Sequence, residues 1–517
     1  MTFEIVFVLL SLLGMVAALI ADKMRPGMIL FSVVVLFLCA GILTPKEMLE
    51  GFSNKGMITV ALLFLVSEGI RQSGTLGQVI KKLLPQGKTT VFKAQLRILP
   101  SVAFISAFLN NTPVVVIFAP IIKHWAKSVK LPATKFLIPL SYVTILGGIC
   151  TLIGTSTNLV VHGMILEAGY EGFTMFELGK VGIFIAIAGI IYLFIFSKRL
   201  LPDARPDTAV PDEEVEEGEK LHRVEAVLGA RFPGINKKLS DFNFQRHYGA
   251  EVKEIKTRNG QRYVDHLEDV VLREGDTLVV MADDTFIPTW GESSVFVLLT
   301  NGNDPDTSGK KKRWLALILL VLMIVGATVG ELPATKEMFP DIKLDMFFFV
   351  CITTIIMAWT NIFPARKYTK YISWDILITI ACAFAISKAM VNSGVADCVA
   401  GFIIGLSDDY GPHVLLAILF VITNLFTELI TNNAAAALAF PLALSISAQL
   451  GVSPTPFFVV ICMAASASFS TPIGYQTNLI VQGIGNYKFT DFVRIGLPLN
   501  IITFLISVIL IPLIWNF

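Results

Sequence analysis

Apolar runs of nearly membrane-spanning length recur along the chain, separated by short polar segments. Residues 3–21, 181–196, 314–330 and 501–517 each approach the roughly 20 residues that cross the hydrocarbon core of a bilayer. The first run contains Glu4 and has no Lys or Arg before it, so we interpret it as a retained span and not as a secretory signal peptide. The pattern predicts an α-helical polytopic membrane protein.

Three polar phrases of the first half return in the second half in the same order. FLVSEGIRQSG (64–74) matches FAISKAMVNSG (384–394), and LIGTSTNLVVHG (152–163) matches PIGYQTNLIVQG (472–483), both 320 residues apart. SAFLNNTPVVVIFAPII (106–122) matches TELITNNAAAALAFPLA (427–443) at an offset of 321. The chain is therefore predicted to contain two membrane repeats, residues 1–200 and 310–517.

Each repeat predicts five transmembrane helices and one re-entrant hairpin. The hairpins, about 92–127 and 412–448, are too long for one span and carry polar tips at their middle, where a simple helix would place them deep in lipid. The fourth helices, about 134–167 and 456–485, are broken by glycine and hydroxyl residues. Five crossings is an odd number, so the second repeat is expected to be inverted. Lys and Arg gather in the loops of one side, which by the positive-inside rule places residues 201–309 in the cytoplasm and both termini outside.

Residues 201–309 interrupt the apolar pattern with a polar segment. Linkers rich in proline and charge, 201–220 and 302–313, flank a core of about 220–300. Within the core we predict a strand in 221–229, a helix over 234–249, a hairpin around Asn259 and Gly260, and a strand within 272–283. The segment predicts a small cytoplasmic α+β domain inserted between the two repeats.

The composition agrees with a membrane protein and argues against other classes. Hydrophobic residues make up 54% of the chain and charged residues 16%, whereas soluble domains carry about 25% charged residues. The net charge of +1 shows no excess of basic residues of the kind that binds nucleic acid. The six cysteines have no C-x-x-C spacing, which argues against a disulfide framework or a zinc site. No nucleophile–base pair or metal cluster stands out, so we expect no enzyme and no organic cofactor.

The repeated polar phrases predict a binding site at mid-membrane. Gly154 and Gly474 permit an unwound turn, after which the resuming helix points its free N–H groups and its positive dipole end into the break. We predict that the following residues bind an anion: Asn110, Asn111, Thr112, Ser156, Thr157, Asn158, Thr431, Asn432, Asn433, Gln476, Thr477 and Asn478. The two hairpin-tip segments, 106–122 and 427–443, and the two broken turns, 152–163 and 472–483, contain no Lys or Arg, so a dianion would need cations bound beside it.

Sodium is the predicted neutraliser, with one ion in each repeat. The first ion is expected near Asn111, Thr112, Gly154 and Asn158, and the second near Asn432, Asn433, Gly474 and Asn478. Each hairpin tip would then face the broken helix of its own repeat. A plainer interpretation is that the Asn and Thr side chains only hydrogen-bond neighbouring helices. Glu428, before the second tip, is either a structural partner of the hairpin or a proton relay.

Four segments resemble the divalent anion/sodium symporter family, in particular its sulfate-permease-like branch. They are AFLNNTPVVVIFAPI, TLIGTSTNLVVHG, ELITNNAAAALAFP and STPIGYQTNLIVQGIGNYKFTDFVRIGLPL. Dicarboxylate members of that family typically carry Ser-Asn-Thr at both hairpin tips, and the different triplets at 110–112 and 431–433 favour the sulfate-like branch. The resemblance implies a homodimer in which a transport domain moves across the membrane against a static scaffold, in an elevator-like way. A bacterial inner membrane fits the size and the lack of targeting signals.

The core of 220–300 resembles a TrkA C-terminal domain, through its strand-helix-strand order and its LREGDTLVV ending. That resemblance implies either a regulatory domain with a small ligand or a brace on the cytoplasmic face. The sequence as a whole predicts sodium-coupled symport of a small divalent anion, sulfate first. The alternatives are a sodium-coupled dicarboxylate transporter, an anion channel or proton-coupled transporter, and a membrane sensor on the same scaffold.

Overall fold

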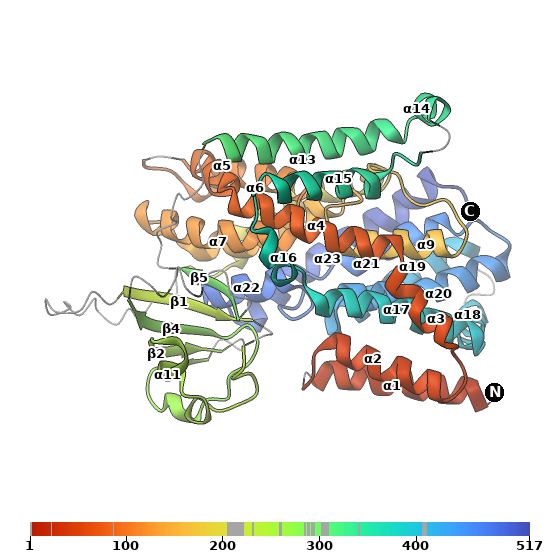
Figure 1. Ribbon diagram of the computed structural model, residues 1–517, viewed down its shortest axis with the longest axis horizontal. Helices are drawn as coiled ribbons and strands as arrows, with labels where there is room; N and C mark the ends of the chain where they lie inside the picture. The colour runs from red at the N-terminus through yellow and green to blue at the C-terminus, as the bar shows by residue number, and fades with distance from the viewer. Residues whose placement is uncertain are drawn as a thin grey trace, which may run out of the picture.

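The fold is a helical bundle with a small β-sheet at one end (Figure 1). The computed structural model describes residues 3–517 except 22, 86, 204–221, 230–231, 258–260, 284–285, 287–289, 291–294, 301–309, 340–341 and 406–410. Within this part of the chain, eight helices are long and apolar enough to cross a membrane. The chain is thus a polytopic α-helical membrane protein with a small sheet region, as predicted.

The helices of the first repeat are α1 Phe3–Ala21, α2 Pro26–Cys39, α3 Pro45–Glu50, α4 Lys55–Gln72, α5 Thr75–Leu83, α6 Val91–Ser106, α7 Asn111–Ser128, α8 Leu137–Gly148, α9 Ser156–Glu167 and α10 Gly179–Leu200. Those of the second repeat are α13 Lys310–Gly330, α14 Pro333–Met338, α15 Met346–Trp359, α16 Tyr368–Tyr371, α17 Trp374–Asn392, α18 Val395–Gly405, α19 Gly411–Leu429, α20 Asn432–Leu450, α21 Thr455–Ser466, α22 Gln476–Gly485 and α23 Phe489–Ile514. Counterpart helices follow in the same order: α2 and α15, α6 and α19, α7 and α20, and α9 and α22 begin 320 or 321 residues apart.

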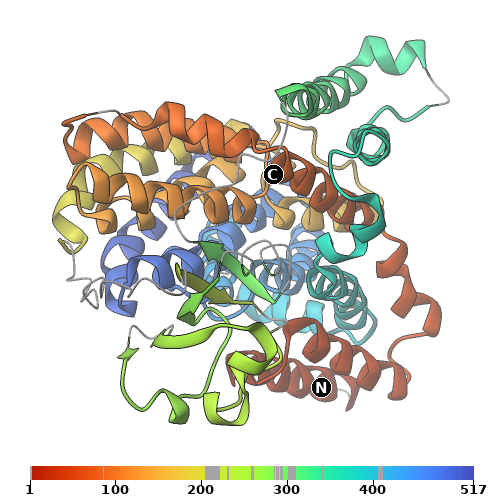
Figure 2. The ribbon, with the colours of Figure 1, turned by 60° about the vertical axis from the view of Figure 1, so that its left-hand side comes forward.

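The last helices of the two repeats run in opposite directions. Helix α10 ends at Leu200, on the side of the sheet, whereas its counterpart α23 ends beside the C-terminus at the opposite end of the bundle (Figure 1). The N-terminus lies at that opposite end too. Figure 2 shows the same bundle from a second direction, with the green helix α13 at its edge.

The two repeats interlock at the segments that carry the polar phrases. The second arm of each hairpin packs on the broken helix of the other repeat, α7 on α22 and α20 on α9. The first arms pack within their own repeat, α6 on α8 and α19 on α21. Helices α6 and α8 approach so closely that a Cβ on Gly147 would lie 2.1 Å from the carbonyl oxygen of Ala103. These contacts bring the two hairpin tips and the two broken turns to the interface between the repeats.

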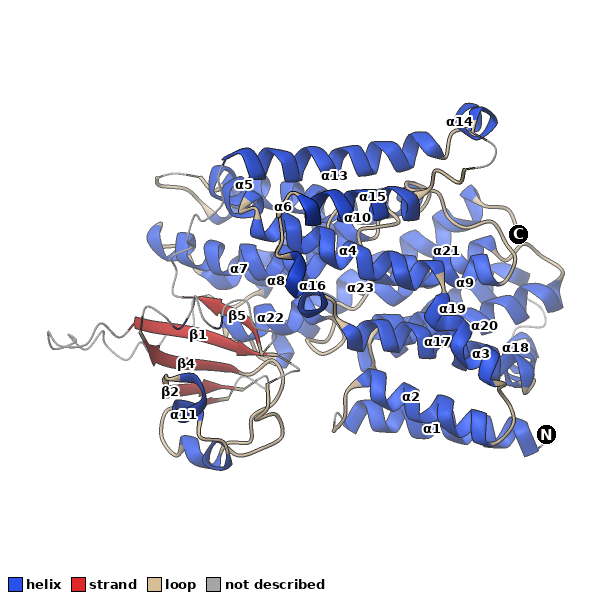
Figure 3. Cartoon of the chain, viewed as in Figure 1, coloured by secondary structure: helices blue, strands red, loops and turns tan. Residues whose placement is uncertain are grey.

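The sheet contains five antiparallel strands in the order β3-β2-β4-β1-β5 (Figure 3). The strands are β1 His222–Leu228, β2 Glu251–Lys256, β3 Arg262–Tyr263, β4 Thr277–Ala282 and β5 Phe296–Thr300. The sheet and its connections, residues 222–300, are called the module below. Among the described residues, its apolar core gathers six buried aromatic side chains, namely Phe232, Phe242, Phe244, Tyr248, Phe286 and Phe296.

The module differs from the prediction in one element and adds another. The helix predicted over 234–249 is reduced to α11, Phe244–Tyr248, preceded by a 3₁₀ turn at Leu239–Asp241. The reason is that the segment before the turn pairs elsewhere: Asn236 has φ +62° and its N–H donates to the carbonyl of Leu272. Strand β5 was not predicted. The Asn259-Gly260 turn and most of both linkers lie outside the described residues.

Candidate functional site

Four helix N-termini meet where the repeats interlock. Helix α7 begins at Asn111, α9 at Ser156, α20 at Asn432 and α22 at Gln476. The residues before α7, α9 and α22 make no side-chain cap, whereas Thr431 accepts from the N–H of Ala434 at the start of α20. The first turn of a helix has N–H groups without intrahelical partners and carries the positive end of the helix dipole. The arrangement therefore concentrates donors and positive potential at one interface.

Hydrogen bonds between the repeats join these helix starts in pairs. Thr112 Oγ1 donates to Gln476 Oε1 over 3.3 Å, linking α7 to α22. Ser156 Oγ and Thr157 Oγ1 donate to Asn433 Oδ1 over 3.4 and 3.3 Å, linking α9 to α20. Five of the residues predicted to bind an anion are thus brought together across the repeat boundary. Thr112 and Asn433, expected near the sodium ions of their own repeats, contact the other repeat here.

Asn111 lies in a group of oxygen atoms within the first repeat. One atom of its side-chain amide lies 2.8 Å from Ser106 Oγ, 2.8 Å from the carbonyl oxygen of Thr144 and 3.3 Å from that of Gly154. When the amide nitrogen occupies this position, its two hydrogens face these three oxygens and can donate to them. The other amide atom lies 2.6 Å from the hydroxyl of Tyr475.

The second repeat builds the corresponding group around Asn432. Thr427 Oγ1, the counterpart of Ser106, lies 3.0 Å from Asn432 Oδ1 and 2.6 Å from the carbonyl oxygen of Ala465. A Cβ on Gly474 would lie 2.5 Å from the carbonyl oxygen of Thr427, so the broken helix of this repeat touches its own hairpin. Both hairpin tips therefore face the broken helix of their own repeat as well as that of the other.

Matching hydrogen bonds hold the two broken turns. In the first repeat, Asn158 Nδ2 donates to the carbonyl of Thr151 over 2.9 Å, and Thr151 Oγ1 accepts from the N–H of Gly154 over 3.1 Å. The second repeat has both bonds, from Asn478 Nδ2 to the carbonyl of Thr471 over 3.1 Å and from the N–H of Gly474 to Thr471 Oγ1 over 3.3 Å. Asn158 and Asn478 are fully buried, and their amides shape the turns.

Other predicted residues lie at the edges of this arrangement. Asn110 and Ser156 line a narrow cleft against α4 and α13, together with Ser67 and Leu320. Thr477 is buried and lies 2.8 Å from Ser141 Oγ of α8, which is also 2.7 Å from Asn478 Oδ1.

Glu428 braces the second broken turn. Its carboxylate accepts from the N–H groups of Ser470 and Thr471 over 2.8 and 2.9 Å, and from Asn500 Nδ2 over 2.7 Å. These contacts favour the structural interpretation of Glu428. The equivalent position of the first repeat is Ala107, so this brace exists in one repeat only.

Sequence reasoning missed Ser106, Thr427, Thr144 and Tyr475. A signal for the first two was present, because hydroxyl residues recur at the same position of both hairpins, five residues before the tip asparagine. Thr144 contributes a backbone carbonyl, which residue types do not reveal. Tyr475 follows Gly474 in the broken turn, but its residue type does not indicate what its long side chain reaches.

The module contacts the helices that build the site. Lys123 Nζ, on α7, donates to the carboxylate of Glu225 on β1 over 3.0 and 3.1 Å. A Cβ on Gly275, just before β4, would lie 2.6 Å from the Leu479 side chain of α22. Burial would raise the pKa of Glu225, but the ammonium groups of Lys123 and Lys256 outweigh it and lower that pKa to about 2. The module is thus held to one helix of each repeat.

Comparison with known proteins identifies the family. A sequence model of the family described as "CitMHS: Citrate transporter" matches residues 16–448 and 338–517. The chain belongs to this citrate transporter family. It is 30% identical to an uncharacterized transporter of Synechocystis sp., over 94% of this chain and 93% of that protein. It is 26% identical to the uncharacterized transporter YfbS of Escherichia coli, over 99% of this chain and 100% of that protein.

A further relative is named for its substrates. The sodium/sulfate cotransporter 2 of Chlamydomonas reinhardtii is 30% identical over 281 residues, which cover 54% of this chain and 31% of that protein. These relatives are named transporters, in line with the expectation that the chain is not an enzyme. The likeness of the module to a TrkA C-terminal domain stays a prediction.

Proposed function

We propose that this transporter carries a small divalent oxyanion, sulfate first, together with sodium. The main support is the meeting of four helix N-termini at the interface of the repeats. Sulfate and phosphate bind at such ends through backbone N–H groups and the helix dipole. In residues 106–122, 152–163, 427–443 and 472–483, all of which the structure describes, there is no Lys or Arg. Neutral donors therefore bind the anion.

Sodium supplies the positive charge that these phrases lack. A dianion moved from water among neutral dipoles has a large desolvation penalty, which bound cations offset. If the Asn111 amide turns its oxygen toward Ser106, Thr144 and Gly154, four oxygens lie close together, and oxygen is the ligand type that hard cations prefer. We propose this as the first sodium site. Thr427, Asn432 and Gly474 provide the corresponding second site.

Sulfate is favoured over dicarboxylates by the hairpin tips and by one relative. The tips read Asn-Asn-Thr at 110–112 and Thr-Asn-Asn at 431–433, unlike the Ser-Asn-Thr of the dicarboxylate symporters that the sequence resembles. The relative from Chlamydomonas reinhardtii is named a sodium/sulfate cotransporter. The name of the citrate transporter family supports a carboxylate substrate, which we keep as the alternative.

We propose that transport moves the hairpins and broken helices as one body against a scaffold, within a homodimer in the inner membrane. The mutual packing of α7 with α22 and of α9 with α20 supports a single moving body. The basic loops on the side of the module support a cytoplasmic module and external termini. In this proposal the module, with or without a small regulatory ligand, moves together with the moving body. Its contacts with Lys123 and Leu479 attach it there.

Uptake by proteoliposomes that contain the purified protein tests the proposal. An inward sodium gradient should drive uptake of ³⁵S-sulfate, and the same gradient of potassium should not. Sulfate uptake that does not depend on sodium and is driven by a pH gradient would support proton coupling or a channel. Preferential uptake of ¹⁴C-succinate would support the dicarboxylate alternative. Deletion of residues 202–309 should leave some sulfate uptake, whereas a pure membrane sensor would show no sodium-driven uptake with or without them.

A further inference from the structure

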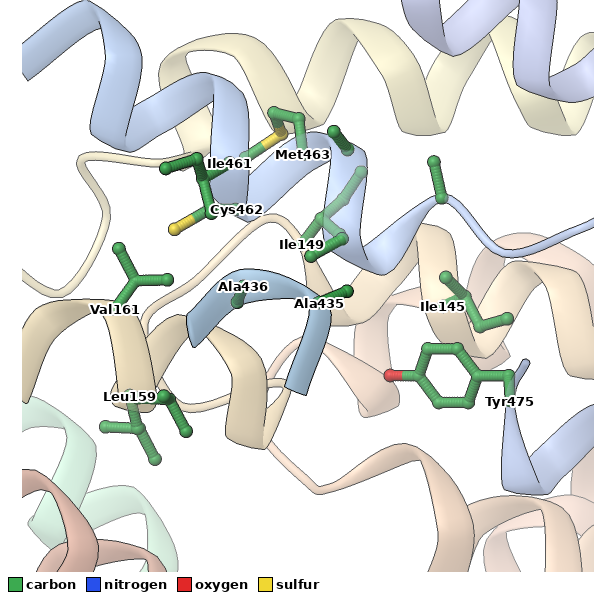
Figure 4. Close-up of a cluster of buried hydrophobic side chains, with 14 of the residues drawn as sticks. Ile145, Ile149, Leu159, Val161, Ala435, Ala436, Ile461, Cys462, Met463 and Tyr475 are labelled. Carbon is green, nitrogen blue, oxygen red and sulfur yellow. The ribbon is translucent and has the colours of Figure 1, made fainter. Parts of the chain in front are cut away.

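Tyr475 breaks the symmetry of the site at its centre. It occupies the residue before α22, and the equivalent residue before α9 is Thr155. Its side chain is buried, with a relative exposure of 7%, and points toward the first turn of α20 (Figure 4). The second repeat therefore places a long aromatic side chain where the first repeat has a short hydroxyl.

The hydroxyl of Tyr475 is shared by both hairpin tips. It lies 2.6 Å from the side-chain amide of Asn111 and 3.0 Å from Thr155 Oγ1, both in the first repeat. The side chain of Asn432, the tip asparagine of the second repeat, interacts with the same hydroxyl. One hydroxyl thus hydrogen-bonds the tip asparagine of the first repeat and interacts with that of the second, and it lies where the proposed anion would meet the four helix N-termini.

The space around the tyrosine ring is apolar. Figure 4 draws Tyr475 in a cluster of buried hydrophobic side chains with Ile145, Ile149, Ala435 and Ala436, all of which have relative exposures of 2% or less. A carboxylate that extended into this space would lose its water without gaining a hydrogen-bond partner, which is costly. A compact anion that stays at the tyrosine hydroxyl avoids that cost.

Resting on the function proposed above, we infer that Tyr475 determines anion specificity. Its ring occupies the space that the second half of a dicarboxylate needs, and its hydroxyl donates to an oxygen of a tetrahedral dianion. A site whose buried donor is left unpaired by the wrong ligand discriminates strongly, whereas filling of apolar space alone gives a smaller factor. The ring and the hydroxyl therefore make separate contributions to anion specificity: the ring excludes dicarboxylates, and the hydroxyl binds sulfate.

Two substitutions separate these contributions. Tyr475→Phe keeps the ring and removes the hydroxyl, so we expect the sulfate concentration for half-maximal uptake to rise about tenfold while succinate remains excluded. Tyr475→Thr restores the residue found at position 155, so we expect sodium-dependent uptake of succinate to appear. The matched control is Tyr192→Phe, a buried tyrosine whose hydroxyl donates to the carbonyl of Ile495 over 3.0 Å, outside the site. The control should keep the sulfate preference.

Ligand-induced thermal stabilisation of the purified protein in sodium gives a readout that does not need transport. The wild type should be stabilised by sulfate and not by succinate, and the Tyr475→Thr variant by both. If the two proteins show this pattern of stabilisation but the wild type takes up no sulfate, the proposed transport function is refuted. The role of Tyr475 in anion specificity would still be supported. A folded Tyr475→Thr variant that still binds sulfate alone, or a wild type stabilised equally by both anions, would overturn the inference.

Discussion

The ion pair between Lys123 of α7 and Glu225 of β1 should hold the module on the membrane part, and replacing Glu225 by Gln tests this. The two side chains are largely buried, with exposures of 23% and 18%, and Glu225 Oε1 also lies 3.4 Å from Lys256 Nζ. Removal of the Glu225 carboxylate takes this ion-pair partner away from the ammonium groups of both Lys123 and Lys256. Loss of one member of a buried pair is destabilising because the remaining charge is poorly solvated.

The magnitude follows from the pKa of Glu225. The carboxyl has an ordinary value of 4.5, and in the folded protein the pKa is about 2. This difference corresponds to about 3 kcal/mol, and solvent screening of a partly exposed pair reduces the expected loss to about 1–3 kcal/mol. Because the folded-state pKa is lowered, the contribution is complete above pH 4.5 and is lost as the pH falls toward 2.

Thermal unfolding and hydrogen exchange of the purified protein measure the effect. Glu225→Gln should lower the melting temperature at pH 7 and speed exchange in β1 and at the module end of α7. Between pH 4.5 and 3 the wild type should lose stability and approach the variant. In a double-mutant cycle with Lys123→Met, the paired change should cost less than the sum of the single changes.

Glu251→Gln is the matched control for this prediction. Glu251 lies on strand β2 of the same sheet, separated from β1 by β4, and its ion pair with Lys253 is exposed, so its loss should change stability by about 0–1 kcal/mol. If Glu225→Gln behaved like this control, and exchange in β1 stayed unchanged, the reasoning that this pair holds the module in place would be refuted.

Two further predictions concern the site and its support. Asn111→Ala and Asn432→Ala should each raise the sodium concentration for half-maximal sulfate uptake by about tenfold, because each removes an amide that faces the proposed cation; unchanged sodium dependence in both would contradict the two sites. Gly147→Ala should destabilise the protein by about 1–3 kcal/mol in thermal unfolding, because its Cβ would lie 2.1 Å from the Ala103 carbonyl oxygen, whereas Gly401→Ala, with only Gln449 at 3.7 Å, should be tolerated.

The helix breaks could be predicted because their chemistry is local. Glycine followed by hydroxyl and amide residues within an apolar run indicates an interrupted helix, and the interval predicted to be broken, 134–167, contains α8, a gap at 149–155 and α9. The repeat could be predicted because similar phrases recur at one offset. Both features depend on residues close together in the chain.

Contacts between the repeats could not be predicted in the same way. The repeat pattern pairs Asn111 with Asn432 as equivalents, but it does not say that α7 packs on α22 or that Thr112 meets Gln476. The role of Tyr475 depends on where its hydroxyl ends, several bonds from the backbone. In the module, the pairing of Asn236 with Leu272 overrides the helical pattern of 234–249, because a backbone hydrogen bond to a distant segment competes with the local helix.

Binding of sulfate measured by titration calorimetry, once in sodium and once in potassium at equal ionic strength, tests the central claim most directly. If neutral helix ends and sodium bind the anion together, sulfate should bind at least about tenfold more tightly in sodium, and sulfate should tighten sodium binding by the same factor. Equal sulfate affinity in the two salts would show that the anion site does not need the cation, and would contradict the account.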